Sequence, residues 1–203
     1  MNKKENWNDY DFVMEQVVNR GRALKFASND LKNNKEIVLL AVAENGLALQ
    51  YASDELKNNP EIVKVAVAQN GNALQYASDE QRNNPEVVKI AVADWGYALQ
   101  YASYEQRNNP EVVKIAVKNY GGALQFASEE LRKNKEIVLI AVASYGLALQ
   151  YASDELRNDP EIFWKAIKKD PNCLKYAGKE IYDVYKSLES QLLEAQLSKL
   201  FKF

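Results

Sequence analysis

The feature that most constrains this chain is a motif that recurs every 25 residues without an insertion. Six glycines mark the interval and a proline takes the seventh position: Gly21, Gly46, Gly71, Gly96, Gly121, Gly146 and Pro171. An aromatic residue follows each of them five positions later: Phe26, Tyr51, Tyr76, Tyr101, Phe126, Tyr151 and Tyr176. A strict period in this range is typical of stacked supersecondary units that cover one another. The sequence therefore predicts a quasi-linear repeat fold.

Each copy begins with a segment that carries the signals of a helix, as residues 59–71 show. Asn59 can cap the helix, Pro60 suits its first turn, and Glu61 places negative charge near the positive end of the helix dipole. Gly71 is expected to end the helix in the left-handed conformation. The residues between these ends are almost all apolar, which predicts a helix covered on several sides.

A strand is the alternative interpretation of the same segment. Residues 62–67 are rich in β-branched side chains, and leucine-rich repeats have a similar period with one strand in each unit. Several observations favour the helix. The span from Pro60 to Asn70 is long for a repeat strand, Ala66 and Ala68 are poor strand formers, and both ends carry helix caps. The leucine–asparagine spacing of leucine-rich repeats is also absent.

The second half of each copy predicts shorter helices. Residues 73–77 can form a short second helix, and Ser78 can cap a third helix of one turn. Asn83 and Asn84 then form a turn. The expected fold class is therefore all-α: an α-solenoid of about seven 25-residue helical repeats with a C-terminal capping helix.

The expected organisation is a single helical repeat domain over residues 1–203, with an N-terminal cap at 1–10, repeats at 11–178 and a C-terminal capping helix at 179–203. Trp7 and Tyr10 are available to cover the first helix. The last segment loses the period, and its apolar residues share one helical stripe: Ile181, Val184, Tyr185, Leu188, Leu192 and Leu200. A helix of this kind seals the last unit. The alternative is a dimerisation helix, which the apolar finish Leu200-Phe201-Lys202-Phe203 encourages.

Composition argues against several functional classes. The formal charge is −2, from 26 basic and 28 acidic residues, which is too balanced for a general nucleic-acid binder. No apolar run reaches the length of a membrane span, and residues 1–7 do not resemble a secretory signal, so a cytoplasmic protein is expected. Histidine is absent and Cys173 is the single cysteine, which removes the usual general base and any disulfide within the chain.

The repeated string is Gly-x-Ala-Leu-Gln-Tyr-Ala-Ser-x-Glu-x-(Lys/Arg)-Asn-Asn-x-Glu-(Ile/Val)-Val-x-x-Ala-Val, which residues 46–67 show most clearly. It resembles the tandem repeats known as domain of unknown function 4116, over about residues 11–178. The copy at Pro171 departs most from the pattern. The resemblance implies helical repeats, found mostly in bacteria and in some secreted proteins of intracellular pathogens, so secretion as an effector is the alternative to a cytoplasmic location. It implies no activity.

Polar residues shared by the internal copies are interpreted as structural. They form an acidic ladder (Glu55, Glu80, Glu105, Glu130, Glu155), a basic ladder (Lys57, Arg82, Arg107, Arg132, Arg157) and a glutamine row (Gln50, Gln75, Gln100, Gln125, Gln150). Acid–base catalysis needs carboxylates in different environments, whereas a ladder offers near-equal ones. The two charged ladders are expected to pair between neighbouring units or to be solvated. The glutamines are expected to satisfy one another or nearby carbonyls.

Residues that differ between copies are stronger candidates for recognition, because stacking is not expected to dictate them. They lie just before and just after the repeated glycine and at position 104. Large aromatic residues at a surface often anchor protein partners. The expected partner-binding patch is made of Trp95, Tyr97, Tyr104, Tyr120 and Tyr145. The alternative is random drift in a composition rich in Asn, Lys, Ile and Tyr.

The leading functional expectation is a non-catalytic repeat scaffold that binds another protein, with a homodimer through the C-terminal helix as a further partner. Nucleic-acid binding through the basic ladder and aromatic stacking is the alternative, which the near-neutral charge disfavours. A self-assembling structural module is a third interpretation. An enzyme is not expected, because no phosphate loop, paired-cysteine metal site or nucleophile with a histidine base is found. No cofactor and no metal are expected.

Overall fold

The computed structural model describes residues 6–200, with side chains as far as Gln196. In this range the chain repeats one order of elements, a ten-residue α-helix, a six-residue 3-10 helix and a four-residue α-helix. No residue of the described range lies in a strand, which confirms the prediction of an all-α repeat fold and excludes the leucine-rich alternative. None of its helices is long and apolar enough to cross a bilayer.

The elements have the following bounds. The long helices are α1 (Tyr10–Asn19), α3 (Lys35–Glu44), α5 (Pro60–Gln69), α7 (Pro85–Asp94), α9 (Pro110–Asn119), α11 (Lys135–Ser144) and α13 (Pro160–Lys169). The 3-10 helices are η1 (Gly21–Phe26), η2 (Gly46–Tyr51), η3 (Gly71–Tyr76), η4 (Gly96–Tyr101), η5 (Gly121–Phe126), η6 (Gly146–Tyr151) and η7 (Pro171–Tyr176). The short helices are α2 (Asn29–Lys32), α4 (Asp54–Lys57), α6 (Asp79–Arg82), α8 (Tyr104–Arg107), α10 (Glu129–Arg132) and α12 (Asp154–Arg157). The last helix is α14 (Lys179–Leu200).

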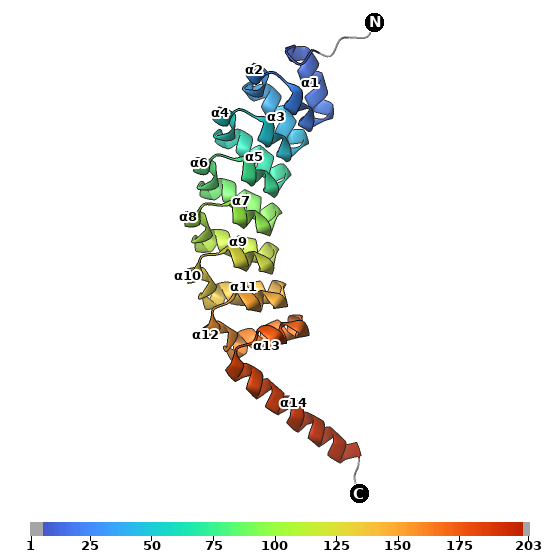
Figure 1. Cartoon of the computed structure of the whole chain (residues 1–203), viewed down its shortest axis with the longest axis vertical. Coiled ribbons are helices and arrows are strands. Elements are labelled where there is room, and N and C mark those ends of the chain that lie inside the picture. The colour runs from blue at the N-terminus through green and yellow to red at the C-terminus, as the bar shows by residue number, and fades with distance from the viewer. Residues whose placement is uncertain (1–5, 201–203) are drawn as a thin grey trace.

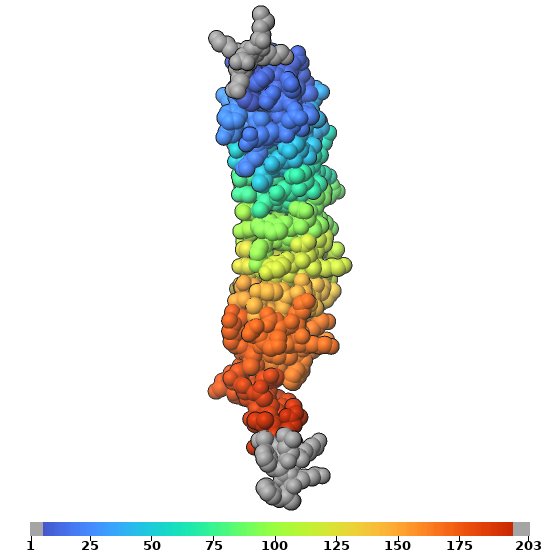
Figure 2. Space-filling view, turned by 90° about the vertical axis from the view of Figure 1, so that its right-hand side faces the viewer, coloured from blue at the N-terminus to red at the C-terminus, as the bar shows by residue number. Residues whose placement is uncertain are grey.

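The repeats stack in one direction and form a narrow, gently curved column (Figure 1). The short helices, from α2 to α12, follow its convex edge (Figure 1). In the space-filling view the repeats appear as successive bands along the column, in the order of the sequence (Figure 2). Each repeat therefore meets the repeats before and after it, which is the geometry of a solenoid.

The predicted caps are present. The side chain of Asn59 accepts hydrogen bonds from the backbone N–H groups of Glu61 (3.0 Å) and Ile62 (3.3 Å), and Pro60 occupies the first position of α5. Ser78 accepts from the N–H of Gln81 at 3.2 Å and so starts α6. These caps satisfy N–H groups in the first turn of each helix, which have no partner within the helix.

The expectation for Gly71 is wrong. No described residue has a positive φ, so the glycine does not end α5 in the left-handed conformation. It begins η3 instead, and it faces the next repeat, where a Cβ atom would overlap the carbonyl oxygen of Ala91. At Gly96 the corresponding Cβ would lie 2.6 Å from the carbonyl oxygen of Ala116. Glycine is required here because successive layers approach closely, not because of a special backbone angle.

The core runs continuously along the column. In the unit that begins at Pro60, the inward side chains Ile62, Val63, Ala66 and Val67 have no exposed surface. A backbone hydrogen bond also joins each unit to the one before, as between the N–H of Ser78 and the carbonyl of Lys57 at 3.0 Å. The same bond recurs at the other junctions: Ser28 to Trp7, Ser53 to Lys32, Ser103 to Arg82, Ser128 to Arg107, Ser153 to Arg132 and Gly178 to Arg157. Burial supplies most of the stability, and this bond fixes the register.

The two charged ladders do not pair with each other. The acidic ladder does bond the preceding repeat, but through an amide: Asn58 donates to Glu80 at 2.9 Å. The equivalent pairs are Asn33 to Glu55, Asn83 to Glu105 and Asn108 to Glu130. Three members of the basic ladder pair within their own repeat: Lys57 with Asp54, Arg82 with Asp79 and Arg157 with Asp154. The reason is helix geometry, because residues three apart on a short helix are neighbours.

Salt bridges between repeats come from the long helices instead. Lys64 pairs with Glu86 of the next unit at 2.5 Å, and Lys114 pairs with Glu136 at 2.9 Å. Glutamines of the row satisfy nearby carbonyls, which is one of the two expected arrangements, rather than one another: Gln75 donates to the carbonyl of Asn72 at 3.0 Å. These side chains are partly exposed, so each pair is expected to add at most about 1 kcal/mol.

Both ends of the column are covered by aromatic residues. At the N-terminal end, the ring of Trp7 lies 5.1 Å from that of Phe12 and 5.0 Å from that of Phe26. At the other end, Ile181 is buried and Tyr185 lies 5.7 Å from Phe163. The first two turns of α14 therefore seal the last repeat.

The remainder of α14 extends beyond the stack (Figure 1). The stripe residues Val184, Leu188 and Leu192 are 51%, 48% and 62% exposed. Sealing the last repeat thus accounts for only the start of this helix. The side chain of Leu200 and residues 201–203, the predicted apolar finish, lie outside the described residues.

Candidate partner-binding site

Four of the five predicted aromatic residues lie together. Trp95, Tyr120 and Tyr145 each occupy the bend between a long helix and the next 3-10 helix, and Tyr97 lies in η4. The ring of Tyr97 is 5.7 Å from that of Trp95 and 4.7 Å from that of Tyr120, and the ring of Tyr120 is stacked on that of Tyr145 at 5.3 Å. We call these four residues the aromatic row. It joins three successive repeats.

Tyr104 is not part of the aromatic row. It is the first residue of α8 on the convex edge, it is 69% exposed, and its ring contacts no other described ring. It replaces an aspartate that elsewhere pairs with the basic residue three positions later, as Asp79 does with Arg82. The predicted patch of five is therefore one cluster of four and one separate tyrosine.

Sequence reasoning missed two members of the site. The ring of Phe126 lies 5.5 Å from that of Tyr97, in an edge-to-face arrangement. Gly122 leaves the space that the rings occupy, because a Cβ atom there would be 2.5 Å from Tyr120 Cε1 and 2.9 Å from the Tyr97 hydroxyl. The sequence contained a signal for Gly122, because a glycine stands there while the equivalent positions in four other repeats carry a side chain: Leu47, Asn72, Tyr97 and Leu147.

The aromatic row replaces residues that cap the 3-10 helices in other repeats. Asn45 and Asn70 accept hydrogen bonds from Leu47 N–H (3.1 Å) and Asn72 N–H (3.0 Å). The bends at Trp95, Tyr120 and Tyr145 have no side-chain cap. A lost cap of this kind costs about 1 kcal/mol, and an aromatic contact returns about 0.5–1.5 kcal/mol. Three neighbouring repeats thus lack a cap that η2, η3 and η7 have, and among the described bends the only other one without a cap is Arg20 before η1.

The residue just before the bend is structural in five repeats, contrary to expectation. Its oxygen accepts the N–H of the glycine that starts the 3-10 helix of the preceding repeat, as Asp94 does from Gly71 at 2.7 Å. The other pairs are Glu44 with Gly21, Gln69 with Gly46, Asn119 with Gly96 and Ser144 with Gly121. Stacking therefore dictates an oxygen acceptor here and leaves its identity free, so the variation at this position does not report recognition.

The hydroxyl groups of the site share one environment. Burial, followed by a hydrogen bond with Tyr120, raises the pKa of Tyr97 to about 12. Burial also raises the pKa values of Tyr145 and Tyr151, with added repulsion from Tyr120. Tyr97 and Tyr145 therefore stay neutral at physiological pH. Rings with a polar hydroxyl group are suited to protein contact.

The raised pKa of Tyr97 predicts a loss of stability in alkali. Its contribution is fully present below pH 10, the ordinary value, and should be lost as pH rises from there to about 12. Tyr97→Phe should lose less stability over this range, measured by urea unfolding at successive pH values. Tyr104→Phe is the control and should behave as the wild type, since Tyr104 is exposed. An unchanged alkaline loss in Tyr97→Phe would contradict the assignment.

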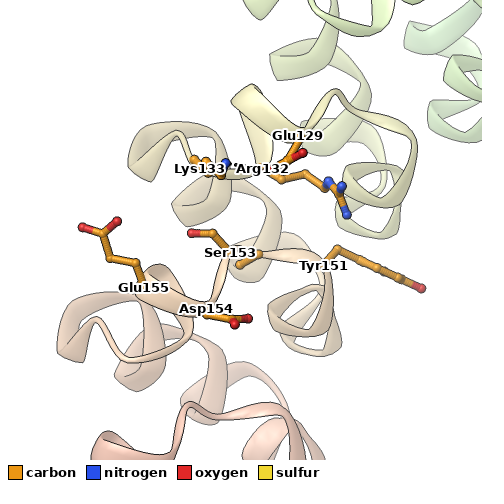
Figure 3. A pocket seen from close by; sticks show the side chains of 8 residues that line it. Glu129, Arg132, Lys133, Tyr151, Ser153, Asp154 and Glu155 are labelled. Atoms are coloured by element: carbon orange, nitrogen blue, oxygen red, sulfur yellow. Dashed lines mark hydrogen bonds and ion pairs between the residues drawn. The ribbon is translucent and has the colours of Figure 1, made fainter.

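A shallow notch of about 480 Å³ lies between α10 and the segment from Tyr151 to Glu155 (Figure 3). Its lining includes Arg132, Lys133, Glu129, Ser153 and Tyr151. Arg132 and Tyr151 extend toward the same side (Figure 3), whereas Lys133 pairs with Glu129 at 2.6 Å. Arg132 forms no ion pair with a described residue. Charges of both signs suit the notch to the polar groups of a peptide rather than to a single anion.

The described residues include no evident site for a metal ion. Over the residues that the structure describes, no group of three Cys, Asp or Glu side chains is arranged to hold an ion. The single thiol, Cys173, is buried, and burial raises its pKa to about 11. A thiol with such a pKa is almost entirely protonated and is a poor nucleophile.

The stacked three-helix units define the chain as an α-solenoid, a class of repeat protein. The chain belongs to the family described as "Domain of unknown function (DUF4116)". Its sequence profile matches residues 9–57, 34–82, 59–107, 84–132, 109–152 and 134–182. Each match begins at a residue that caps a long helix, such as Asn34 or Asn59, so the family's unit and the structural unit share one boundary. No curated protein sequence and no solved structure matches the chain.

Proposed function

We propose that this chain is a non-catalytic scaffold that binds another protein through the aromatic row. The observation that supports the proposal most is the exchange of capping residues for Trp95, Tyr120 and Tyr145 in three adjacent repeats. Local rules of this kind are commonly broken where function requires it. Tyrosine and tryptophan are also the residues that most often contribute the binding energy of protein interfaces.

The test restores the cap that the row replaces. In the variant Trp95→Asn/Tyr120→Asn/Tyr145→Asn, three caps are gained as the ring contacts are lost, so the free energy of unfolding should change by no more than about 1–2 kcal/mol. Proteins of the source cell that the wild type retains in affinity capture should be lost from the variant. The control is Tyr104→Asp, which restores the consensus residue outside the row and should retain them.

Identical captured sets for the wild type and the triple variant, at equal stability, would remove the support for this surface. Loss of the same proteins from Tyr104→Asp would instead place recognition on the convex edge, around Tyr104 and the unpaired Arg107. Measuring both variants side by side therefore assigns the contact to one surface or the other.

The basic ladder gives little support to nucleic-acid binding. Lys57, Arg82 and Arg157 each pair with an aspartate of their own repeat. Phosphate contacts would require these pairs to break, and near-neutral overall charge supplies no general attraction. We place the scaffold in the cytoplasm, supported by a chain whose one cysteine is buried and unpaired.

A further inference from the structure

An asparagine at the end of each short helix joins neighbouring repeats at four junctions. Its side-chain amide bridges two groups of the next repeat, because its oxygen accepts from a serine hydroxyl and its NH₂ group donates to a glutamate. At Asn83 these bonds are 2.6 Å to Ser103 and 3.0 Å to Glu105. The other bridging residues are Asn33, Asn58 and Asn108. Each amide thus satisfies one donor and one acceptor of the adjacent repeat.

Lys133 occupies this position after α10, and the bridge is missing there. Lys133 pairs instead with Glu129, at the start of the same helix, at 2.6 Å. The hydroxyl group of Ser153 therefore donates to no described residue, and its oxygen only accepts from the N–H of Leu156 at 3.4 Å. The carboxylate of Glu155, which is exposed, likewise forms no hydrogen bond or ion pair within the described chain. A donor and an acceptor that other junctions satisfy internally are thus left for another molecule.

Arg132 is a third group without a partner at this junction. The members of the basic ladder that form ion pairs do so with an aspartate three positions earlier. Before Arg132 this position holds Glu129, whose longer side chain reaches Lys133. Arg132 is half-buried, it pairs with no described carboxylate, and its Nε atom is buried without a hydrogen-bond partner. A guanidinium group in this state is suited to bind a carboxylate.

These three groups line the notch between α10 and residues 151–155. Ser153 and Glu155 extend toward one side of the notch, whereas Arg132 extends toward the other (Figure 3). The remaining charges of the lining are already paired, Lys133 with Glu129 and Asp154 with Arg157. The notch therefore offers a hydroxyl donor and a carboxylate acceptor on one side and an unpaired cation on the other.

We propose that the notch binds a peptide segment of a partner protein that presents an asparagine or glutamine side chain close to a carboxylate. The amide of the peptide takes the place of the missing asparagine, so that its oxygen accepts from Ser153 and its NH₂ group donates to Glu155. The carboxylate of the peptide pairs with Arg132. A ligand with carboxylates alone fits less well, because Glu155 would repel it and would keep no donor.

This inference goes beyond the proposed function, since no residue of the aromatic row lines the notch. Its test uses defined probes and the purified chain, whereas the test of the aromatic row uses captured proteins. Either proposal can therefore fail without the other.

The first measurement is a titration of the purified full chain with N-acetylasparagine and the longer N-acetylglutamine, followed by NMR. Each probe carries one primary amide and one carboxylate. The backbone amide signals of residues 133, 153 and 155 should shift, with a millimolar dissociation constant because the probes are small. The control probes, N-acetylaspartate and N-acetylglutamate, have the same shapes but a second carboxylate, and they should bind at least about tenfold more weakly. Equal binding of the amide and acid probes, or no shift with either amide probe, would overturn the proposal.

The second measurement restores the bridge with the variant Lys133→Asn. Its melting temperature should rise above that of the wild type, because the new amide satisfies Ser153 and Glu155. The amide probes should bind at least about tenfold more weakly, since the groups that they need are occupied. The matched control is Lys168→Asn, which removes an exposed lysine of α13 and should leave both the melting temperature and the binding unchanged. Wild-type affinity in Lys133→Asn would refute the site, and a melting temperature that does not rise would refute the missing bridge.

The role of Arg132 has its own variant. Arg132→Gln should weaken the binding of the amide probes by about fivefold or more, because their carboxylate loses its cation. N-acetylasparagine amide, which has no carboxylate, should bind the wild type and Arg132→Gln alike. An affinity for N-acetylasparagine and N-acetylglutamine that Arg132→Gln leaves unchanged would contradict this pairing.

Discussion

Replacing Gly46 by alanine is expected to destabilise the protein by about 3 kcal/mol, the upper part of the range for overpacking a well-packed core. The added methyl group would overlap the carbonyl oxygen of Ala66, which belongs to the backbone of the next repeat and has no rotamer to change. The layers must separate, and the hydrogen bond from Gly46 N–H to Gln69 (2.6 Å) is weakened as they do. The free energy of unfolding from urea titration measures the effect.

Gly178→Ala provides the matched control for this prediction. The three atoms nearest to the new methyl group would all belong to the side chain of Asn158, which can rotate away. Its cost should be about 1 kcal/mol, since Asn158 also accepts hydrogen bonds from the start of α14. Equal costs for Gly46→Ala and Gly178→Ala would show that close approach of the layers does not explain the repeated glycine.

Leu99→Ala should destabilise the protein by a similar amount, but by removing core volume rather than by overpacking. Leu99 has no exposed surface, and its truncation leaves a cavity between two repeats, which typically costs about 3 kcal/mol. Because each repeat contacts only its neighbours, the loss should be local. Hydrogen exchange should accelerate in α7, η4 and α9, while α1 and α3 keep their protection.

The repeat supplies its own control for this substitution. Leu174 occupies the equivalent position in the last unit, where it is half-buried, so Leu174→Ala should cost about 1 kcal/mol. If Leu99→Ala loosened protection uniformly along the whole column, the chain would behave as one cooperative globule rather than as a stack.

The sequence was sufficient for the architecture because its strongest signals are local. Asn59, Pro60 and Ser78 act through hydrogen bonds and backbone angles within their own helices, and each does what its type predicts. A period repeated along most of the chain then requires that neighbouring units pack alike. Neither inference requires knowing which side chains contact each other in the folded protein.

The errors concern contacts between repeats, where the partner lies 20 or more residues away. Gly71 was expected to bend the backbone, but its role is set by Ala91 in the next layer. The acidic and basic ladders were expected to pair between repeats or to be solvated; they do not pair, and the exposed Glu80 accepts from Asn58 instead. Sequence spacing gives the distance along the chain and leaves open which of several polar neighbours lies within hydrogen-bonding distance.

The candidate site likewise has features that the sequence predicted and features that depend on contacts between repeats. The prediction that variable aromatic residues of adjacent repeats would cluster holds for Trp95, Tyr97, Tyr120 and Tyr145, whose equivalent positions are stacked. Tyr104 lies apart because its short helix belongs to the convex edge. The contribution of Gly122 is visible only in three dimensions, since it consists of space that Tyr97 and Tyr120 fill.

The backbone bond from each repeat to the carbonyl of the one before makes all junctions alike, and this turns the chain into a molecular ruler. Adding one 25-residue copy between η2 and α5 would move the aromatic row away from the N-terminal end of the column by one layer, about 8–10 Å for packed helices, without altering the row or that end. The distance between the row and the start of the column could thus change through duplication of a whole copy while the contacts within each repeat stay the same.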